Sequence, residues 1–163
     1  MALKLILVRH AKSSWDDLTL PDHDRPLNKR GRASARALGD WLRHEGMLPD
    51  QIFTSSAQRT LETLDLMQLA VKPVVKSALY HAGAFAMLHQ IKDATGRKVM
   101  VLGHNPGIGE LAERLARKLP KHQKFLDYPT GATTVFRFNT DSWKDVEFGT
   151  GKVKSFVIPR ELI

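Results

Sequence analysis

The 163-residue sequence predicts an α/β domain in which a mainly parallel central sheet carries helices on both faces. Short apolar segments alternate along most of the chain with segments of helical periodicity, a pattern typical of parallel strands joined by helical crossovers. Polar residues directly follow several of the apolar segments. Because ligands bind at the carboxyl ends of the strands in such folds, these polar residues are the first candidates for function.

The first expected strand covers residues 3–8, an apolar run typical of a strand buried on both faces, and it ends at Arg9 and His10. After a polar loop, Asn28 can cap a helix that ends near Gly46. The apolar residues that share one face of this helix are Ala37, Leu38, Trp41 and Leu42. This spacing predicts that the helix lies against the sheet.

The second expected strand covers residues 51–54, and Ser55 or Ser56 can cap the helix that follows it. Leu61, Leu64 and Met67 recur along that helix at three-residue spacing. Arg59 falls in its first turn, close to the end of the preceding strand.

Two more strand and helix pairs are expected, with strands at residues 73–76 and 98–102. The first of the two helices should turn Phe85, Leu88 and Ile91 toward the core. The second should be lined by Ile108, Leu111, Ala112 and Leu115. His104 lies in the turn before this last helix, again just after a strand.

The C-terminal part changes to β-type segments at residues 134–138 and 152–158, with Gly149 and Gly151 in the turn between them. These segments are expected to add strands to the same sheet. With 42% hydrophobic residues, the chain is long enough to bury one core and short for two, so residues 1–163 should form a single domain.

Composition excludes several kinds of chemistry. The sequence contains no cysteine, which rules out a disulfide framework, a thiolate zinc site and a cysteine nucleophile. The apolar run at residues 5–8 is far too short for a signal sequence or a membrane span. The expectation is a cytoplasmic protein without a membrane partner.

The formal net charge of +8 would attract phosphorylated substrates, acidic proteins or nucleic acid. The densest basic segment, residues 114–124, has few aromatic side chains on which bases could stack, so it is interpreted as a solvated helix end and loop. No nucleic-acid partner is expected.

Arg9, His10, Arg59 and His104 are far apart in the sequence, yet each lies just after an expected strand. Two arginines would supply permanently charged donors for phosphate oxygens. Their positive charge would also lower the pKa of a nearby histidine and keep its imidazole neutral and nucleophilic. The helix that starts near Gly107 would add free N–H groups for an anion, so the chemistry needs no metal and no cofactor.

These residues and their neighbours resemble the histidine phosphatase superfamily, the branch that contains phosphoglycerate mutases, and in particular its short SixA-type phosphohistidine phosphatases. The matching segments are residues 7–13 (LVRHAKS), 25–27 with Gly31, 54–56 with Arg59, Thr60 and Thr63, and 103–106 (GHNP). They span most of the chain in the order of the family.

The resemblance implies a three-layer α/β/α sandwich in which His10 becomes phosphorylated, Arg9 and Arg59 hold the phosphoryl group, and His104 stabilises it. Ser13 and Asn105 lie in the matching segments and are candidates for substrate binding. The partner that the resemblance implies is a phosphorylated protein, such as a phosphohistidine domain, or a small phosphorylated substrate, and the expected state is a monomer.

The sequence departs from the family in two places. Ala11 stands where many members have glycine, and residues 79–83 offer no carboxylate where larger members carry a glutamate as the general acid. His81 is a candidate for that role, with Asp22 or Asp24 as the alternative. Because the imidazole of phosphohistidine leaves more easily than an alkoxide, phosphohistidine is the substrate compatible with a weak acid.

Other functions remain open at this point. The chain has little room for the insertions that enclose small metabolites in larger relatives, which disfavours phosphoglycerate mutase activity. A broad-specificity phosphatase of small phosphoesters and a binding module that recognises phosphate without turnover are the alternatives. The acid-labile phosphoenzyme expected on His10 distinguishes an enzyme from a binding module.

Overall fold

The computed structural model describes residues 2–163, and its six strands form one sheet in the order β3-β2-β4-β1-β5-β6. The strands are β1 (Leu3–Arg9), β2 (Gln51–Thr54), β3 (Val74–Val75), β4 (Lys98–Gly103), β5 (Thr133–Phe138) and β6 (Lys152–Val157). Strands β1 to β4 pair in parallel, whereas β5 and β6 join antiparallel beside β1. The predicted sheet, with its added C-terminal strands, is confirmed.

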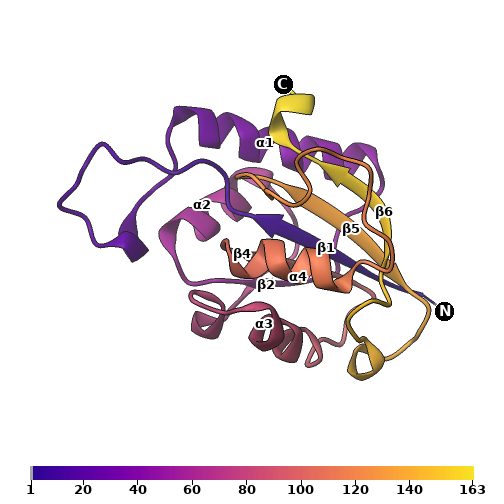
Figure 1. Ribbon diagram of the computed structural model, residues 1–163. Coiled ribbons are helices and arrows are strands. Elements are labelled where there is room, and N and C mark those ends of the chain that lie inside the picture. The colour runs from indigo at the N-terminus through magenta and orange to yellow at the C-terminus, as the bar shows by residue number, and fades with distance from the viewer. Residues whose placement is uncertain (1) are drawn as a thin grey trace.

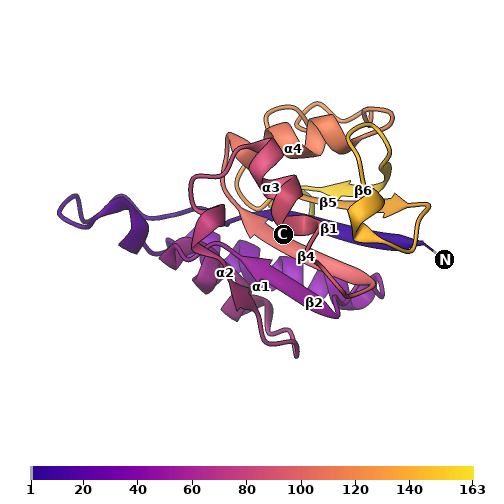
Figure 2. The ribbon, with the colours of Figure 1, turned by 90° about the horizontal axis from the view of Figure 1, so that it is seen from below.

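Four α-helices cover the two faces of the sheet (Figures 1 and 2). They are α1 (Lys29–His44), α2 (Gln58–Met67), α3 (Ala84–Ile91) and α4 (Gly107–Leu115). Alternate residues of β1 divide between two cores: Leu5 and Leu7 join the residues of α3 and α4, while Ile6 and Val8 join those of α1 and α2. This is the expected three-layer α/β/α arrangement. None of the helices among residues 2–163 has the length and apolar character to cross a membrane.

The start of α1 fixes the loop that follows β1. Asn28 caps the helix as predicted, since its side chain accepts a hydrogen bond from the Gly31 N–H at 2.8 Å. The Asn28 N–H in turn donates to the Lys12 carbonyl at 3.0 Å. Gly31 lies so close to this carbonyl that a Cβ built on it would stand 2.0 Å from the Lys12 oxygen. The absence of a side chain at Gly31 therefore lets the helix support the backbone just after His10.

Replacing Gly31 by alanine is expected to lower the free energy of unfolding by about 1–3 kcal/mol, because the added methyl group must displace backbone atoms rather than a flexible side chain. Gly83→Ala is the matched control. Gly83 has an ordinary φ of −82° and nothing within 4 Å of a built Cβ, so its loss should stay below about 1 kcal/mol. Urea unfolding measures the free energy of unfolding of both variants, and an equal decrease in the two would contradict the role given to Gly31.

Three details differ from the sequence-based expectations. Neither Ser55 nor Ser56 caps α2, which begins at Gln58 after Ala57 without a side-chain cap, because the Ser55 hydroxyl is used elsewhere. The side chain of Phe85 is 75% exposed, since Ala84 and Met87 occupy the inner face of α3 together with the two predicted residues of that face. The third strand has only two residues, both exposed at the sheet edge.

Candidate active site

The parallel strands bring the four predicted residues to one end of the sheet. Arg9 ends β1 and pairs in register with Gly103, so His10 and His104 follow neighbouring strands. The centroids of the two imidazole rings are 5.3 Å apart. Arg59 reaches the same place from the first turn of α2. His10, Arg59 and His104 are all buried, with exposed fractions of 5%, 6% and 8%.

A hydrogen bond to the backbone orients the ring of His10. Its Nδ1 lies 2.7 Å from the carbonyl oxygen of Ala11. A carbonyl can only accept, so Nδ1 carries the proton and Nε2 keeps a free lone pair. The Ala11 N–H donates to Thr63 Oγ1 at 3.0 Å, which ties this backbone to α2. His10 is therefore held with Nε2 available as a nucleophile.

His104 is set as a donor. Ser55 Oγ receives the Ala57 N–H at 3.3 Å and lies 2.8 Å from His104 Nε2. When the Ser55 hydroxyl gives its own proton to Nε2, the proton of the neutral imidazole resides on Nδ1. Nδ1 is buried and has no hydrogen-bond partner among residues 2–163. It can therefore donate to an oxygen of a bound group.

The two arginines present free donors as well. Arg9 donates through NH1 to the Tyr128 carbonyl at 3.0 Å, and Arg59 donates through NH1 to the Asp22 carbonyl at 2.8 Å. The Nε of each guanidinium is buried without a partner in the described part of the chain. Unpaired buried donors are rare in folded proteins. Together with His104 Nδ1 they form a set of N–H groups suited to an oxyanion.

Asp22 links the two sides of the site. Its carboxylate accepts hydrogen bonds from Tyr80, Arg59 and Arg25. The Tyr80 hydroxyl, followed by the charge of Arg59, holds the pKa of Asp22 well below its usual range. Asp22 is thus a carboxylate at neutral pH, which argues against the alternative that it is the proton donor. Arg25 also donates to Ser13 Oγ at 2.6 Å, so Ser13 lies beside this network.

Tyr80 is a site residue that the sequence analysis did not single out. Its ring contacts the rings of His104, His23 and His81, with centroids 5.5, 4.7 and 4.0 Å away. The sequence feature that could have identified Tyr80 is its position in residues 79–83, where larger members of the family carry the glutamate that acts as general acid. His81 and Asp24 are both exposed, and the Asp24 carboxylate lies 3.6 Å from Nδ1 of His23. His81 stays the candidate proton donor, with Asp24 as the alternative.

Asn105 has a different position from the one expected of a substrate ligand. Its amide nitrogen donates to the carbonyls of Asp127 and Tyr128 at 3.2 and 2.9 Å, and its oxygen accepts the Gly109 N–H at 3.1 Å. Its polar atoms are occupied by the protein. Asn105 therefore fastens the loop before β5 onto α4, and we do not include it among the phosphate donors.

Burial and neighbouring charge keep both site histidines neutral. Burial, together with the positive charges of Arg9, Arg59 and Arg25, lowers the pKa of His10 to about 4, although the hydrogen bond to the Ala11 carbonyl acts in the opposite direction. Burial also lowers the pKa of His104 to about 3, helped by His10 and Arg59. At neutral pH the nucleophile therefore needs no deprotonation.

These pKa values predict how stability depends on pH. An unfolded histidine takes up a proton near pH 6.5, so between about pH 6.5 and 4 the unfolded chain binds protons that the folded site does not. The free energy of unfolding should be undiminished above pH 6.5 and should fall as the pH is lowered through this window. Urea unfolding at several pH values measures the slope, and the double variant His10→Asn/His104→Asn should reduce it. An NMR titration of either ring near pH 6.5 would contradict the prediction.

Comparison with known proteins gives the family. The model of the histidine phosphatase superfamily (branch 1) matches residues 5–80. An uncharacterized protein of Mycobacterium tuberculosis is 32% identical over 161 residues, which cover 94% of this chain and 100% of that protein. An uncharacterized chloroplastic protein of Arabidopsis thaliana is 38% identical over 128 residues, which cover 69% of this chain and 59%, less than two thirds, of the plant protein.

Solved structures agree. A candidate phosphohistidine phosphatase SixA from Nakamurella multipartitia superposes with a TM-score of 0.87 at 26% identity, covering 98% of this chain and 97% of that one. A protein histidine phosphatase SixA in complex with tungstate shares the fold, with a TM-score of 0.76 at 19% identity, over 99% of this chain and 100% of that one. The chain belongs to the histidine phosphatase superfamily. Within it, the fold and motifs are those of the short SixA type.

Proposed function

We propose that the protein is a metal-independent phosphatase that removes the phosphoryl group from phosphohistidine in another protein. His10 Nε2 attacks phosphorus, and the bond from phosphorus to the substrate imidazole breaks with its electron pair going to the leaving nitrogen. That nitrogen takes up a proton, for which His81 is the candidate donor. Water then attacks the phosphorus of phosphorylated His10, and the bond from phosphorus to Nε2 breaks with its electron pair returning to Nε2, which releases phosphate carrying the water protons and restores the neutral imidazole.

The observation that carries this proposal is the set of buried, unpartnered N–H groups beside a free imidazole nitrogen. Arg9 Nε, Arg59 Nε and His104 Nδ1 have no acceptor among residues 2–163, although such donors are costly to bury unpaired. A phosphoryl group would satisfy them and would stabilise the negative charge of the transition state without a metal ion.

Two features favour a protein substrate over a small one. The loop between β1 and α1 extends beyond the sheet (Figure 1), and its Trp15 and Leu18 side chains are 64% and 83% exposed. Exposed apolar side chains beside a site suit contact with another protein surface. The structurally similar Nakamurella protein is a candidate phosphohistidine phosphatase, which supports the same substrate class here.

The test is phosphate release in the presence of a chelator, from a phosphohistidine protein domain and from an aryl phosphate. Release that survives chelation and favours the phosphohistidine protein supports the proposal. A preference for the aryl phosphate would indicate a broad-specificity phosphatase, and binding without turnover of either would indicate a phosphate-recognising module. Monomeric state and cytoplasmic location remain predictions, which sedimentation and cell fractionation would check.

A further inference from the structure

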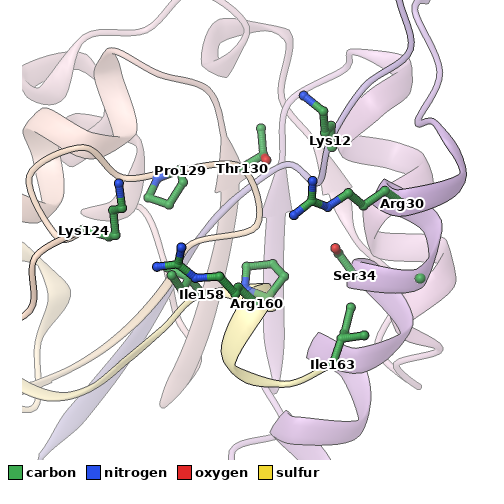
Figure 3. A pocket seen from close by; sticks show the side chains of 11 residues that line it. Lys12, Arg30, Ser34, Lys124, Pro129, Thr130, Ile158, Arg160 and Ile163 are labelled. Carbon is green, nitrogen blue, oxygen red and sulfur yellow. The ribbon is translucent and has the colours of Figure 1, made fainter.

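A basic pocket, whose lining side chains are drawn in Figure 3, includes Lys12, two residues after His10 in the chain. Its volume is about 480 Å³, and it is formed by the first turns of α1, the loop before β5 and the C-terminal turn after β6. The charged side chains that line it are Lys12, Arg30, Lys124 and Arg160. Pro129, Ile158 and Pro159 give it an apolar wall. None of these residues has a role in the chemistry proposed above.

The charged side chains that line this pocket are all basic. No residue with a carboxylate side chain lines it. Lys124 lies 3.6 Å from Asp127, whereas Lys12, Arg30 and Arg160 have no carboxylate side chain within ion-pair distance among residues 2–163. Arg30 projects from α1 and Arg160 from the C-terminal turn (Figure 3). Such a concentration of one sign of charge in a concave site attracts anionic groups.

The pocket and the nucleophile share a wall. Lys12 follows His10 by two residues, a separation of at most about 7 Å along the chain. On the other side, the Gly131 N–H donates to the His10 carbonyl at 2.9 Å, and Thr130, just before it, lines the pocket. A molecule with a phosphoryl group at His10 can therefore reach the pocket with a neighbouring part of its surface.

We propose that this pocket binds acidic side chains of the phosphorylated protein substrate, an inference that rests on the proposed function. The four charges are spread over separate elements, which suits several carboxylates better than a single phosphate ion, whose donors converge as they do around His10. The apolar wall suits the methylene groups of glutamate. No aromatic side chain lines the pocket to stack a base, which disfavours nucleic acid.

A comparison of two substrates tests the docking role. The variants Arg30→Glu and Arg160→Glu, singly and together, are assayed on the phosphohistidine protein domain and on an aryl phosphate. The ratio of kcat/KM for the protein to that for the aryl phosphate should fall about tenfold in the double variant, and the loss should be smaller at high salt. Lys144→Glu, the same charge change on an exposed residue near the opposite end of β1, is the matched control and should leave the ratio unchanged.

Binding without turnover keeps this inference separate from the proposed function. Isotope-labelled protein is titrated with an unphosphorylated peptide of alternating glutamate and alanine, and NMR shifts are expected at the amides of Arg30, Ser34 and Thr130. The double variant should abolish them. Absence of these shifts, or an unchanged substrate ratio in an active enzyme, would overturn the docking role while leaving the phosphatase intact. If no phosphohistidine protein is dephosphorylated, the proposed function fails, and shifts with the peptide would then show only that the pocket binds acidic peptides.

Discussion

Phosphate release is expected to fall on the order of 10⁵-fold when His10 is replaced by alanine, because removal of a nucleophile closes the covalent route altogether. Wild-type protein incubated with labelled phosphohistidine substrate should carry an acid-labile phosphoryl group. The His10→Ala variant should carry none. Rapid-quench measurement of bound label, together with steady-state phosphate release, gives both quantities.

Two controls separate loss of the nucleophile from loss of the fold. His44→Ala removes an exposed imidazole at the end of α1, far from the chemistry proposed here, and should change the rate less than about twofold. His10→Ala should still bind an oxyanion such as tungstate, since Arg9, Arg59 and His104 keep their free N–H groups. Substantial phosphate release by His10→Ala would show that the nucleophile has been misassigned.

The residues that follow the parallel strands could be placed together from the sequence. Arg9, His10 and His104 stand directly after buried apolar runs, and parallel register leaves them no other place than one end of the sheet. The same reasoning located Arg59 through the short strand before it. Strand periodicity and helix spacing were sufficient to place these residues, because both patterns depend only on residues close together in the sequence.

The surrounding network could not be predicted in the same way. Asp22, Arg25 and Tyr80 meet through side chains of irregular segments, whose paths depend on tertiary contacts and not on a repeating pattern. Ser55 is a single residue whose role could not be predicted from the sequence. Its position before a helix favoured a cap, but the nearby imidazole of His104 is a competing acceptor that only the folded chain provides.

The predicted inner face of α3 was partly wrong, because a small residue lies in the core where a large neighbour was expected. The spacing of Phe85, Leu88 and Ile91 fits a helical face, and two of the three are buried. Ala84 and Met87 complete the actual inner face one position away, which leaves Phe85 in solvent. Hydrophobicity gives more weight to phenylalanine than to alanine. The sequence pattern therefore could not predict how this helix is rotated about its axis relative to the core.

Arg59→Met is expected to lower kcat/KM about 10³-fold, the loss typical of removing a charged donor from a phosphoryl-transfer site. The substitution removes the free Nε and both hydrogen bonds to Asp22. It also removes a positive charge that lowers the pKa of His10 and of His104, so both pKa values should rise. Steady-state kinetics and NMR titration of the two imidazoles measure these effects separately.

Two further variants show which property of Arg59 matters. Arg59→Lys keeps a positive charge but loses the planar arrangement of donors, so the histidine pKa values should stay low while kcat/KM remains at least about tenfold below wild type. Asp22→Asn keeps every arginine N–H and removes the negative charge that pairs with the guanidinium of Arg59. If Asp22 only positions Arg59, combining Asp22→Asn with Arg59→Met should add little to the loss caused by Arg59→Met alone. An Arg59→Met variant with kcat/KM within tenfold of wild type would instead show that Arg59 serves to anchor the loop and not to hold the phosphoryl group.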